Sequence, residues 1–170
     1  MAFREVVAAL STSVVAVAAL VVAAPSASAA AKYCNYNLSA DAGECFYSHH
    51  ALAQRKAALA QVDYIHVVNW VNYNTGAGVL EIGGSSACTL AIDNEGKKLP
   101  DLTKLRYRLP DGSAGATLNN SISSVKVYNG CVVQFFDGVG YSGAVSPWTG
   151  ANPDLSYMGF YDRASSLDIT

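Results

Sequence analysis

The fold is decided by two matching segments, Asn119-Asn120-Ser121-Ile122-Ser123-Ser124-Val125-Lys126-Val127 and Tyr161-Asp162-Arg163-Ala164-Ser165-Ser166-Leu167-Asp168-Ile169. Each starts as a polar turn, continues with a pair of serines and ends in alternating apolar and polar residues. This is the pattern of a loop that enters a half-buried strand. An internal repeat built from such short strands favours paired β units over a helical protein.

The second copy is preceded by a strand and a glycine-rich turn, Val132–Gly143. Its Gly-x-Gly-x-x-Gly spacing is typical of a dinucleotide site, but such a site requires a helix directly after the glycines. Pro147 and its neighbours show no helical period, so we reject nucleotide binding. The glycines are expected instead to relax the backbone of a folded hairpin, which leaves the rings of Phe136 and Tyr141 to pack.

Together these segments resemble the βγ-crystallin superfamily. Its Greek-key unit carries an aromatic, four residues, a second aromatic, one residue and glycine, and it ends in two Asn/Asp, two variable residues, Ser/Thr and Ser. Phe136, Tyr141 and Gly143 match the first part of this signature, and Asn119–Ser124 matches the second. The resemblance covers residues 64–170, and it departs in the first unit, where the aromatic and glycine spacing does not match.

The resemblance implies an all-β protein with a βγ-crystallin-like double Greek-key sandwich at residues 63–170, made of units at about 63–128 and 129–170. Residues 30–62 precede it, and we expect them to form a disulfide-closed hairpin and one short helix. Ser48 is the expected cap of a helix from Ala51 to about Gln61. The expected first strands of the sandwich are Tyr64–Trp70 and Val79–Ile82, which are rich in β-branched and aromatic residues.

Residues 1–29 have the pattern of a secretory signal peptide. Arg4 supplies the charged start, Val14–Ala24 is an apolar run, and Ala27-Ser28-Ala29 is a small-residue cleavage site. A membrane-spanning helix is the alternative, but Ser11-Thr12-Ser13 interrupts the run and no basic cluster follows it. We therefore predict a secreted protein that has no membrane contact after cleavage.

Four cysteines lie in the part of the chain that would be exported. An even number of cysteines in a secreted chain indicates disulfides, and three pairings are possible. Cys34 and Cys45 bracket a turn signal, which pairs them locally and leaves Cys88 and Cys131 as partners. On the chain-entropy account, these two loops stabilise the fold by about 3 and about 4 kcal/mol. No Cys-x-x-Cys spacing supports a metal-thiolate site.

Charge argues against two classes of partner. The formal net charge is −2, so nothing in the charge balance points to nucleic acid or an anionic membrane. The one cationic feature lies in Asp93–Ala116, which the spacing of the repeat marks as an insertion. There, Leu105, Tyr107 and Leu109 alternate with Lys104, Arg106 and Arg108. This pattern predicts an edge strand whose cationic row blocks edge-to-edge pairing. An anion-binding face is the alternative, but four acidic residues lie nearby in the sequence.

Calcium is the candidate ligand that the resemblance implies. In the family, the serine-ended loops donate oxygens to calcium, and the corresponding residues here are Asn119, Asn120, Ser121, Ser123, Asp162 and Ser165. By the same resemblance, Ser124 would hydrogen-bond the hairpin. Calcium takes six to eight oxygen ligands and binds more tightly to carboxylates. Because the first loop has no carboxylate and the second has Tyr161 and Arg163, any site is expected to be weak. The alternative is that these side chains only satisfy turn backbone.

No other chemistry is indicated. His49 and His50 are adjacent and so point to different sides of their element, which disfavours a zinc site with His66. No hydrolase or metalloprotease motif occurs, so we do not expect an enzyme.

We therefore predict a secreted, monomeric βγ-crystallin-type binding or structural module with possible weak calcium binding. Its partner would be an extracellular protein or a cell-surface target. The resemblance also suggests an alternative, an inhibitor of secreted metalloproteases or a killer-toxin-like antimicrobial protein. An inhibitor would present a rigid exposed loop, for which Asp93–Ala116 is the candidate.

Overall fold

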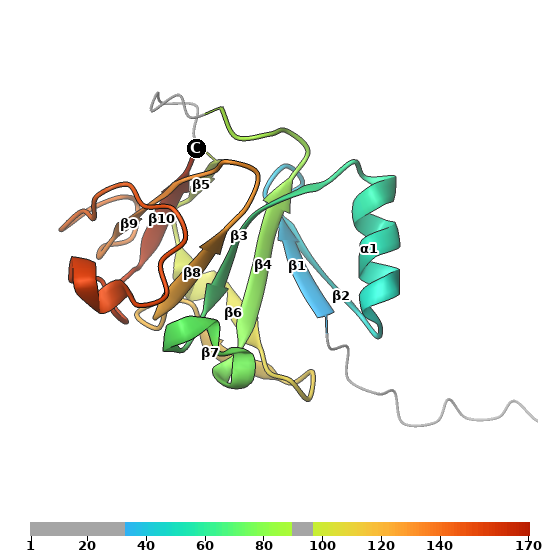
Figure 1. The fold of residues 1–170 in the computed structure, drawn as a ribbon, viewed down its shortest axis with the longest axis horizontal. Helices are drawn as coiled ribbons and strands as arrows, with labels where there is room; N and C mark the ends of the chain where they lie inside the picture. The colour runs from blue at the N-terminus through green and yellow to red at the C-terminus, as the bar shows by residue number, and fades with distance from the viewer. Residues whose placement is uncertain (1–32, 90–96) are drawn as a thin grey trace, which may run out of the picture.

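A computed structural model describes residues 33–89 and 97–170 of the chain. The predicted signal peptide, residues 1–29, lies outside the described residues. Two β-sheets face each other, and one helix lies on the outer side of the larger sheet (Figure 1).

The larger sheet is built around β3 (Val62–Val68), which pairs antiparallel with β4 (Val79–Gly84) on one edge and with β8 (Ser124–Val127) on the other. The predicted N-terminal hairpin is β1 (Tyr33–Asn37) and β2 (Ala42–Phe46), which pair antiparallel. β1 also pairs with β4, in parallel. The hairpin therefore continues the sheet of the sandwich instead of packing on it as a separate layer.

The smaller sheet contains β5 (Lys97–Leu99), β10 (Ser166–Ile169) and β9 (Val133–Phe136), in that order and antiparallel. β5 comes from the first unit, but it pairs with β10 of the second. In return, Asn152 of the second unit bridges to Val125 on β8 of the first, through two backbone hydrogen bonds of 2.8 and 2.9 Å. This exchange of strands between units makes the domain a double Greek-key sandwich.

The core lies between the two sheets and follows from alternation along each strand. On β9, Val133 and Phe135 are fully buried, whereas Gln134 between them is partly exposed. On β10, Leu167 and Ile169 are fully buried and Asp168 is partly exposed. Period-two burial of this kind is what places one face of each strand in the core.

Both predicted disulfides are formed. Cys34 and Cys45 face each other across β1 and β2, and Cys88 is bonded to Cys131. The second bond ties the connection after β4 to the residues before β9, so it links the first unit to the second.

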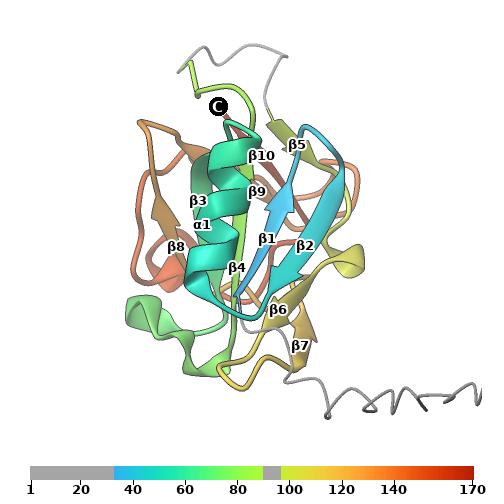
Figure 2. The same cartoon turned by 90° about the vertical axis from the view of Figure 1, so that its right-hand side faces the viewer.

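The predicted short helix is α1 (His49–Ala58), which covers the outer face of the larger sheet beside β1 and β2 (Figure 2). Ser48 caps it by accepting a hydrogen bond from the Ala51 amide at 3.1 Å. The helix ends three residues before the predicted Gln61, because Ala60 adopts a left-handed conformation with φ of 47°. Among the described residues, no helix is long and apolar enough to cross a bilayer.

Four short 3-10 helices lie in the connections: η1 (Val71–Tyr73), η2 (Thr75–Ala77), η3 (Leu102–Lys104) and η4 (Leu155–Met158). The first of these marks a correction to the sequence analysis. Trp70, predicted to be a strand residue, lies beyond the end of β3 and is 50% exposed.

The described part of the predicted insertion belongs to both sheets. Besides β5, it contributes β6 (Arg106–Arg108) and β7 (Ala114–Thr117). β6 lies between β4 and β7, so the prediction that it forms an edge strand is wrong, and β7 takes the edge instead. The segment is not a surface insertion, because Leu99, Leu102 and Tyr107 are buried in the core.

The exchange of β5 between units predicts a large loss of stability when its buried side chain is truncated. Leu99 is 4% exposed and lies opposite Leu167 of β10. The Leu99→Ala variant is expected to lower the free energy of unfolding by about 2–5 kcal/mol, measured by urea denaturation. The matched control is Leu59→Ala, because Leu59 is 37% exposed on the outside of the fold. An equal loss of unfolding free energy in the two variants would contradict the conclusion that β5 is part of the core sandwich.

Candidate metal centre

The two matching segments form equivalent loops that lead into β8 and β10. At the second position of each loop, the backbone passes through the left-handed region, with φ of 54° at Asn120 and 49° at Asp162. Asn and Asp tolerate this conformation better than most residues with a side chain. The residue types at these positions are therefore suited to the turn as well as to ligand binding.

The two loops bond to each other reciprocally. The Ser123 hydroxyl donates to Asp162 Oδ1 at 2.7 Å, and the Ser165 hydroxyl donates to Asn120 Oδ1 at 3.3 Å. Backbone amides repeat the pattern: Asn120 N donates to the Ala164 carbonyl at 2.8 Å, and Asp162 N donates to the Ile122 carbonyl at 3.1 Å. The fifth position of each loop thus meets the second position of the other, as an approximate twofold axis requires.

The last serine of each loop is fully buried and bonds to the folded hairpin of its own unit. Ser124 donates to the Trp70 carbonyl at 2.6 Å. Ser166 donates to the Gly138 carbonyl at 2.7 Å and accepts from the Tyr141 amide at 3.0 Å. The predicted hairpin bond of Ser124 is therefore present, and the two serines occupy equivalent corners.

The second hairpin has the predicted aromatic packing. The rings of Phe136 and Tyr141 meet edge to face with their centroids 5.5 Å apart. Gly143 has φ of 80°, and a Cβ on it would lie 2.0 Å from Asp137 Oδ1. Asp137 can therefore accept the Ala144 amide bond, at 2.6 Å, only because residue 143 has no side chain.

Four of the six predicted metal ligands come together between the loops: Asn120, Ser123, Asp162 and Ser165. They offer two hydroxyl oxygens, one amide oxygen and one carboxylate. A hydroxyl that now donates to a carboxylate rotates readily to offer a lone pair to a cation instead. The arrangement provides two half-sites, each with one oxygen from either loop.

The other two predicted ligands are placed differently. The Ser121 hydroxyl donates to the Thr117 carbonyl, and the Ser121 carbonyl accepts from the Tyr107 hydroxyl at 3.0 Å. Burial raises the pKa of Tyr107, so this hydroxyl stays protonated. Asn119 Oδ1 is buried and has no hydrogen-bond partner among the described residues. It is a spare acceptor at the start of the first loop.

Arg163, which stands beside Asp162 in the sequence, is bound elsewhere. Its guanidinium donates to Asp137 Oδ2 at 2.7 Å and to the Gly159 carbonyl at 2.9 Å. The hydrogen bond from Arg163 lowers the pKa of Asp137. Because this cation has a carboxylate partner in the hairpin, the charge of Asp162 is left for the shared loop site.

A second group of possible ligands was missed in the sequence. Asp63 and His66 on β3 and Glu81 on β4 have ligand atoms within 4.8 Å of one another, under α1. His66 Nε2 is buried without a hydrogen-bond partner among the described residues, while the other ring nitrogen lies 3.1 Å from the Tyr128 hydroxyl. The signal was the placement of polar residues in two otherwise apolar strands, which only strand register turns into a cluster.

Lys56 already occupies the centre of this second group. Its ammonium lies 2.7 Å from Asp63 and 2.5 Å from Glu81. Burial acts to lower the pKa of Lys56, but the hydrogen bonds to the two carboxylates outweigh it and raise the pKa. Burial lowers the pKa of His66, although the charge of Glu81 opposes the shift. The protonated Lys56 holds both carboxylates in an internal ion-pair network, while His66 Nε2 lies 3.9 Å from Glu81.

Strand exchange and equivalent serine corners are the defining features of one architecture. The chain has a βγ-crystallin-like fold. No family model matches the sequence, and no curated protein matches it.

Solved βγ-crystallin domains are similar to this chain in structure. One, from work titled "Evolution of the eye lens beta-gamma-crystallin domain fold", is 16% identical with a TM-score of 0.42, and the match covers 63% of this chain and 84% of that one. A βγ-crystallin from an archaeon is 19% identical with a TM-score of 0.39, covering 63% and 96%. A clostrillin double mutant in complex with nickel is 17% identical with a TM-score of 0.41, covering 64% and 98%.

The Asp137–Arg163 pair predicts a pH dependence of stability. Because the folded state lowers the pKa of Asp137, the pair stabilises the fold above the ordinary pKa of about 4, and the stabilisation is lost as the pH falls through the folded value. Asp137→Asn should therefore be less stable than the parent at pH 7 and lose less on acidification to pH 2. Urea unfolding midpoints at pH 7, 4 and 2 measure this. Arg163→Gln should show the same flattening; an unchanged acid response in both variants would contradict the prediction.

Proposed function

We propose that this protein is an extracellular binding or structural module whose two paired loops take up calcium weakly and are stabilised by it. One observation carries the proposal: Ser123 with Asp162, and Ser165 with Asn120, are brought together across the two units. The resemblance of these loops to the calcium-binding loops of βγ-crystallins supports the choice of ion.

The donor set supports low affinity. Only Asp162 brings a formal negative charge to the paired loops, and the remaining side-chain donors are neutral oxygens. Calcium requires six to eight oxygens, so backbone carbonyls and water would complete each half-site. A site with few carboxylates belongs in the range of extracellular modules, with dissociation constants of roughly 0.1–1 mM. Such a site is filled where calcium is abundant.

Both disulfides support an extracellular location, because disulfides persist in oxidising compartments. The proposed secretion rests on these bonds together with the predicted signal peptide. The proposed partner is an extracellular protein or a cell-surface target, met by the monomer. A βγ-crystallin-like domain held by cystines and ion-filled loops suits a role in which resistance to unfolding matters.

The roles of metalloprotease inhibitor and killer-toxin-like protein remain alternatives that rest on the sequence resemblance. The loop considered for an inhibitor receives no further support. From Lys97 onward, its described residues form strands and place Leu99 and Leu102 in the core.

Calcium is expected to raise the melting temperature of the oxidised protein, and chelator should reverse the change. At ten times the dissociation constant, one site adds roughly 1.4 kcal/mol to the free energy of unfolding. For a domain of this size, that corresponds to about 3–6 °C. Differential scanning calorimetry with 10 mM calcium, 10 mM magnesium or EDTA measures the shift.

Two variants test whether the calcium-dependent rise in melting temperature comes from the paired loops. Asp162→Asn keeps the shape of the side chain and removes its charge, so most of the calcium-dependent shift should disappear. Ser156→Ala, at an exposed position of η4 outside the loops, is the control and should keep the full shift. No shift in the parent at 10 mM calcium, or an undiminished shift in Asp162→Asn, would remove the proposal.

A further inference from the structure

The N-terminal hairpin divides one edge of β4 between two strands. β6 pairs with β4 only at Val79, which lies opposite Arg108. Two residues further in the same antiparallel register, Arg106 would lie opposite Glu81, but Asn35 of β1 takes that place. β1 and β6 therefore diverge from a shared edge, and a notch opens between them.

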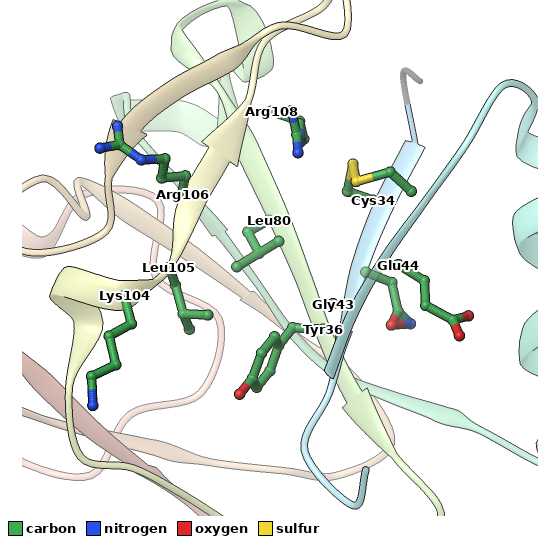
Figure 3. Close-up of a pocket in the computed structure, with 11 residues that line it drawn as sticks. Cys34, Tyr36, Gly43, Glu44, Leu80, Lys104, Leu105, Arg106 and Arg108 are labelled. Carbon is green, nitrogen blue, oxygen red and sulfur yellow. A yellow bond between two sulfur atoms is a disulfide. The ribbon is translucent and has the colours of Figure 1, made fainter. Parts of the chain in front are cut away.

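The notch is a cavity of about 330 Å³. Figure 3 shows Leu80 and Leu105 between the two strands, with the Tyr36 ring projecting into the space from β1. Two further hollows continue it. One of about 150 Å³ shares Tyr36, Lys104 and Leu105 with the notch, and one of about 310 Å³ shares Arg108. Three hollows that share walls in series suit an extended ligand better than a compact one.

The strands beside the notch have unpaired backbone edges. β1 pairs with β4 only from Asn35 onward, so Tyr33 and Cys34 have no strand partner on that side within the described part of the chain. β6 likewise has no described partner on its β4 side at Arg106. Unpaired edges bind an extended peptide by adding it as a strand, because its amides and carbonyls complete the ladder.

The notch is cationic. Lys104 of η3 and Arg108 of β6 line it on one side, whereas the Arg106 side chain points away from the space and donates to the Gly115 carbonyl at 3.2 Å (Figure 3). Arg108 is partly buried, and its guanidinium makes no ion pair or hydrogen bond with the described residues. Arginine forms paired hydrogen bonds with carboxylates. A half-buried arginine without a partner is therefore a binding position for an acidic group.

The acidic residues around these hollows are already engaged. Glu44 forms two hydrogen bonds of 2.7 Å with Arg55 of α1. Asp41 accepts the hydroxyl of Tyr36, and Asp101 accepts the amide and the hydroxyl of Thr103 and lies 3.4 Å from the Lys104 ammonium. Glu81, which lines the second hollow with Arg108, is ion-paired with Lys56. None of these carboxylates forms an ion pair with Arg108, so the charge of Arg108 remains available to an acidic ligand although the chain carries a net charge of −2.

We propose that the notch between β1 and β6 binds an extended acidic peptide of a partner protein. The peptide adds to a free strand edge, its carboxylates pair with Arg108 and compete with Asp101 for Lys104, and its apolar side chains lie on Leu80 and Leu105. This site is separate from the paired loops and does not depend on calcium.

Fluorescence anisotropy tests the proposal with a labelled octapeptide of alternating Glu and Val, using the full oxidised protein in EDTA. The Glu-Val peptide should bind at least about tenfold more tightly than its Gln-Val counterpart, and high salt should weaken it. A Glu-Val peptide with N-methylated alternate amides should lose binding, because it cannot complete the strand ladder. Absence of binding by the Glu-Val peptide, or equal binding by the methylated one, would overturn the proposal. So would equal binding by an oligogalacturonate of the same charge, which would assign the notch to acidic glycans.

Charge-matched variants locate the peptide. Lys104→Gln and Arg108→Gln should each weaken binding several-fold or more. Lys126→Gln removes the same charge from β8, outside the notch, and should leave the affinity unchanged. Melting temperatures of all three variants verify that each is folded. Equal weakening by Lys126→Gln and Arg108→Gln would show attraction to overall charge and would contradict a site in the notch.

Discussion

The two units of this domain depend on each other through their serine-ended loops. The serine hydroxyl at the fifth position of each loop donates to the side chain at the second position of the other loop. The backbone amide at the second position of each loop donates to a backbone carbonyl of the other. Neither loop is satisfied alone. β5 of the first unit pairs with β10 of the second, and Asn152 of the second unit bridges to Val125 of the first. The two units therefore also depend on each other within both sheets. A single unit would leave buried polar groups and an open apolar face, both of which are costly.

The hydrogen bonds between the two loops also explain why the contact between them is a candidate ion site. Oxygen atoms from two distant parts of the chain converge because the loops are related by an approximate twofold axis, and the only carboxylate among them belongs to Asp162. Arg163 does not cancel that charge, because its guanidinium is bound to Asp137. The two loops thus already hydrogen-bond to each other, through oxygens that a cation could also bind.

The N-terminal hairpin and α1 shape one edge of the larger sheet. β1 joins the sheet in parallel and displaces β6 from most of the edge of β4, while α1 covers the outer face through ion pairs from Arg55 and Lys56. The cystine between Cys34 and Cys45 holds the hairpin that makes this displacement possible. The notch therefore results from competition between two strands for the same hydrogen-bonding groups.

Local patterns were sufficient for part of this structure. The capped helix, the pairing of the cysteines, the glycine-rich hairpin and the serine corners were all predictable, because each depends on residues close in sequence or on a repeated motif. The inclusion of β5, β6 and β7 in the sheets was not. Charge, glycine and proline in that stretch suggested an insertion with one edge strand, whereas β6 lies between two strands and Leu99, Leu102 and Tyr107 are buried in the core.

By itself, the sequence determined that two homologous β units with serine-ended corners would form, since periodicity and turn chemistry act locally. The tertiary structure alone decided which oxygens meet between the loops, and that Lys56 fills the group formed by Asp63, His66 and Glu81. It also leaves Arg108 without an ion-pair partner within residues 33–89 and 97–170. These outcomes depend on strand register and on which strand takes a given edge. Both are set by contacts between residues far apart in the chain, which no local pattern records.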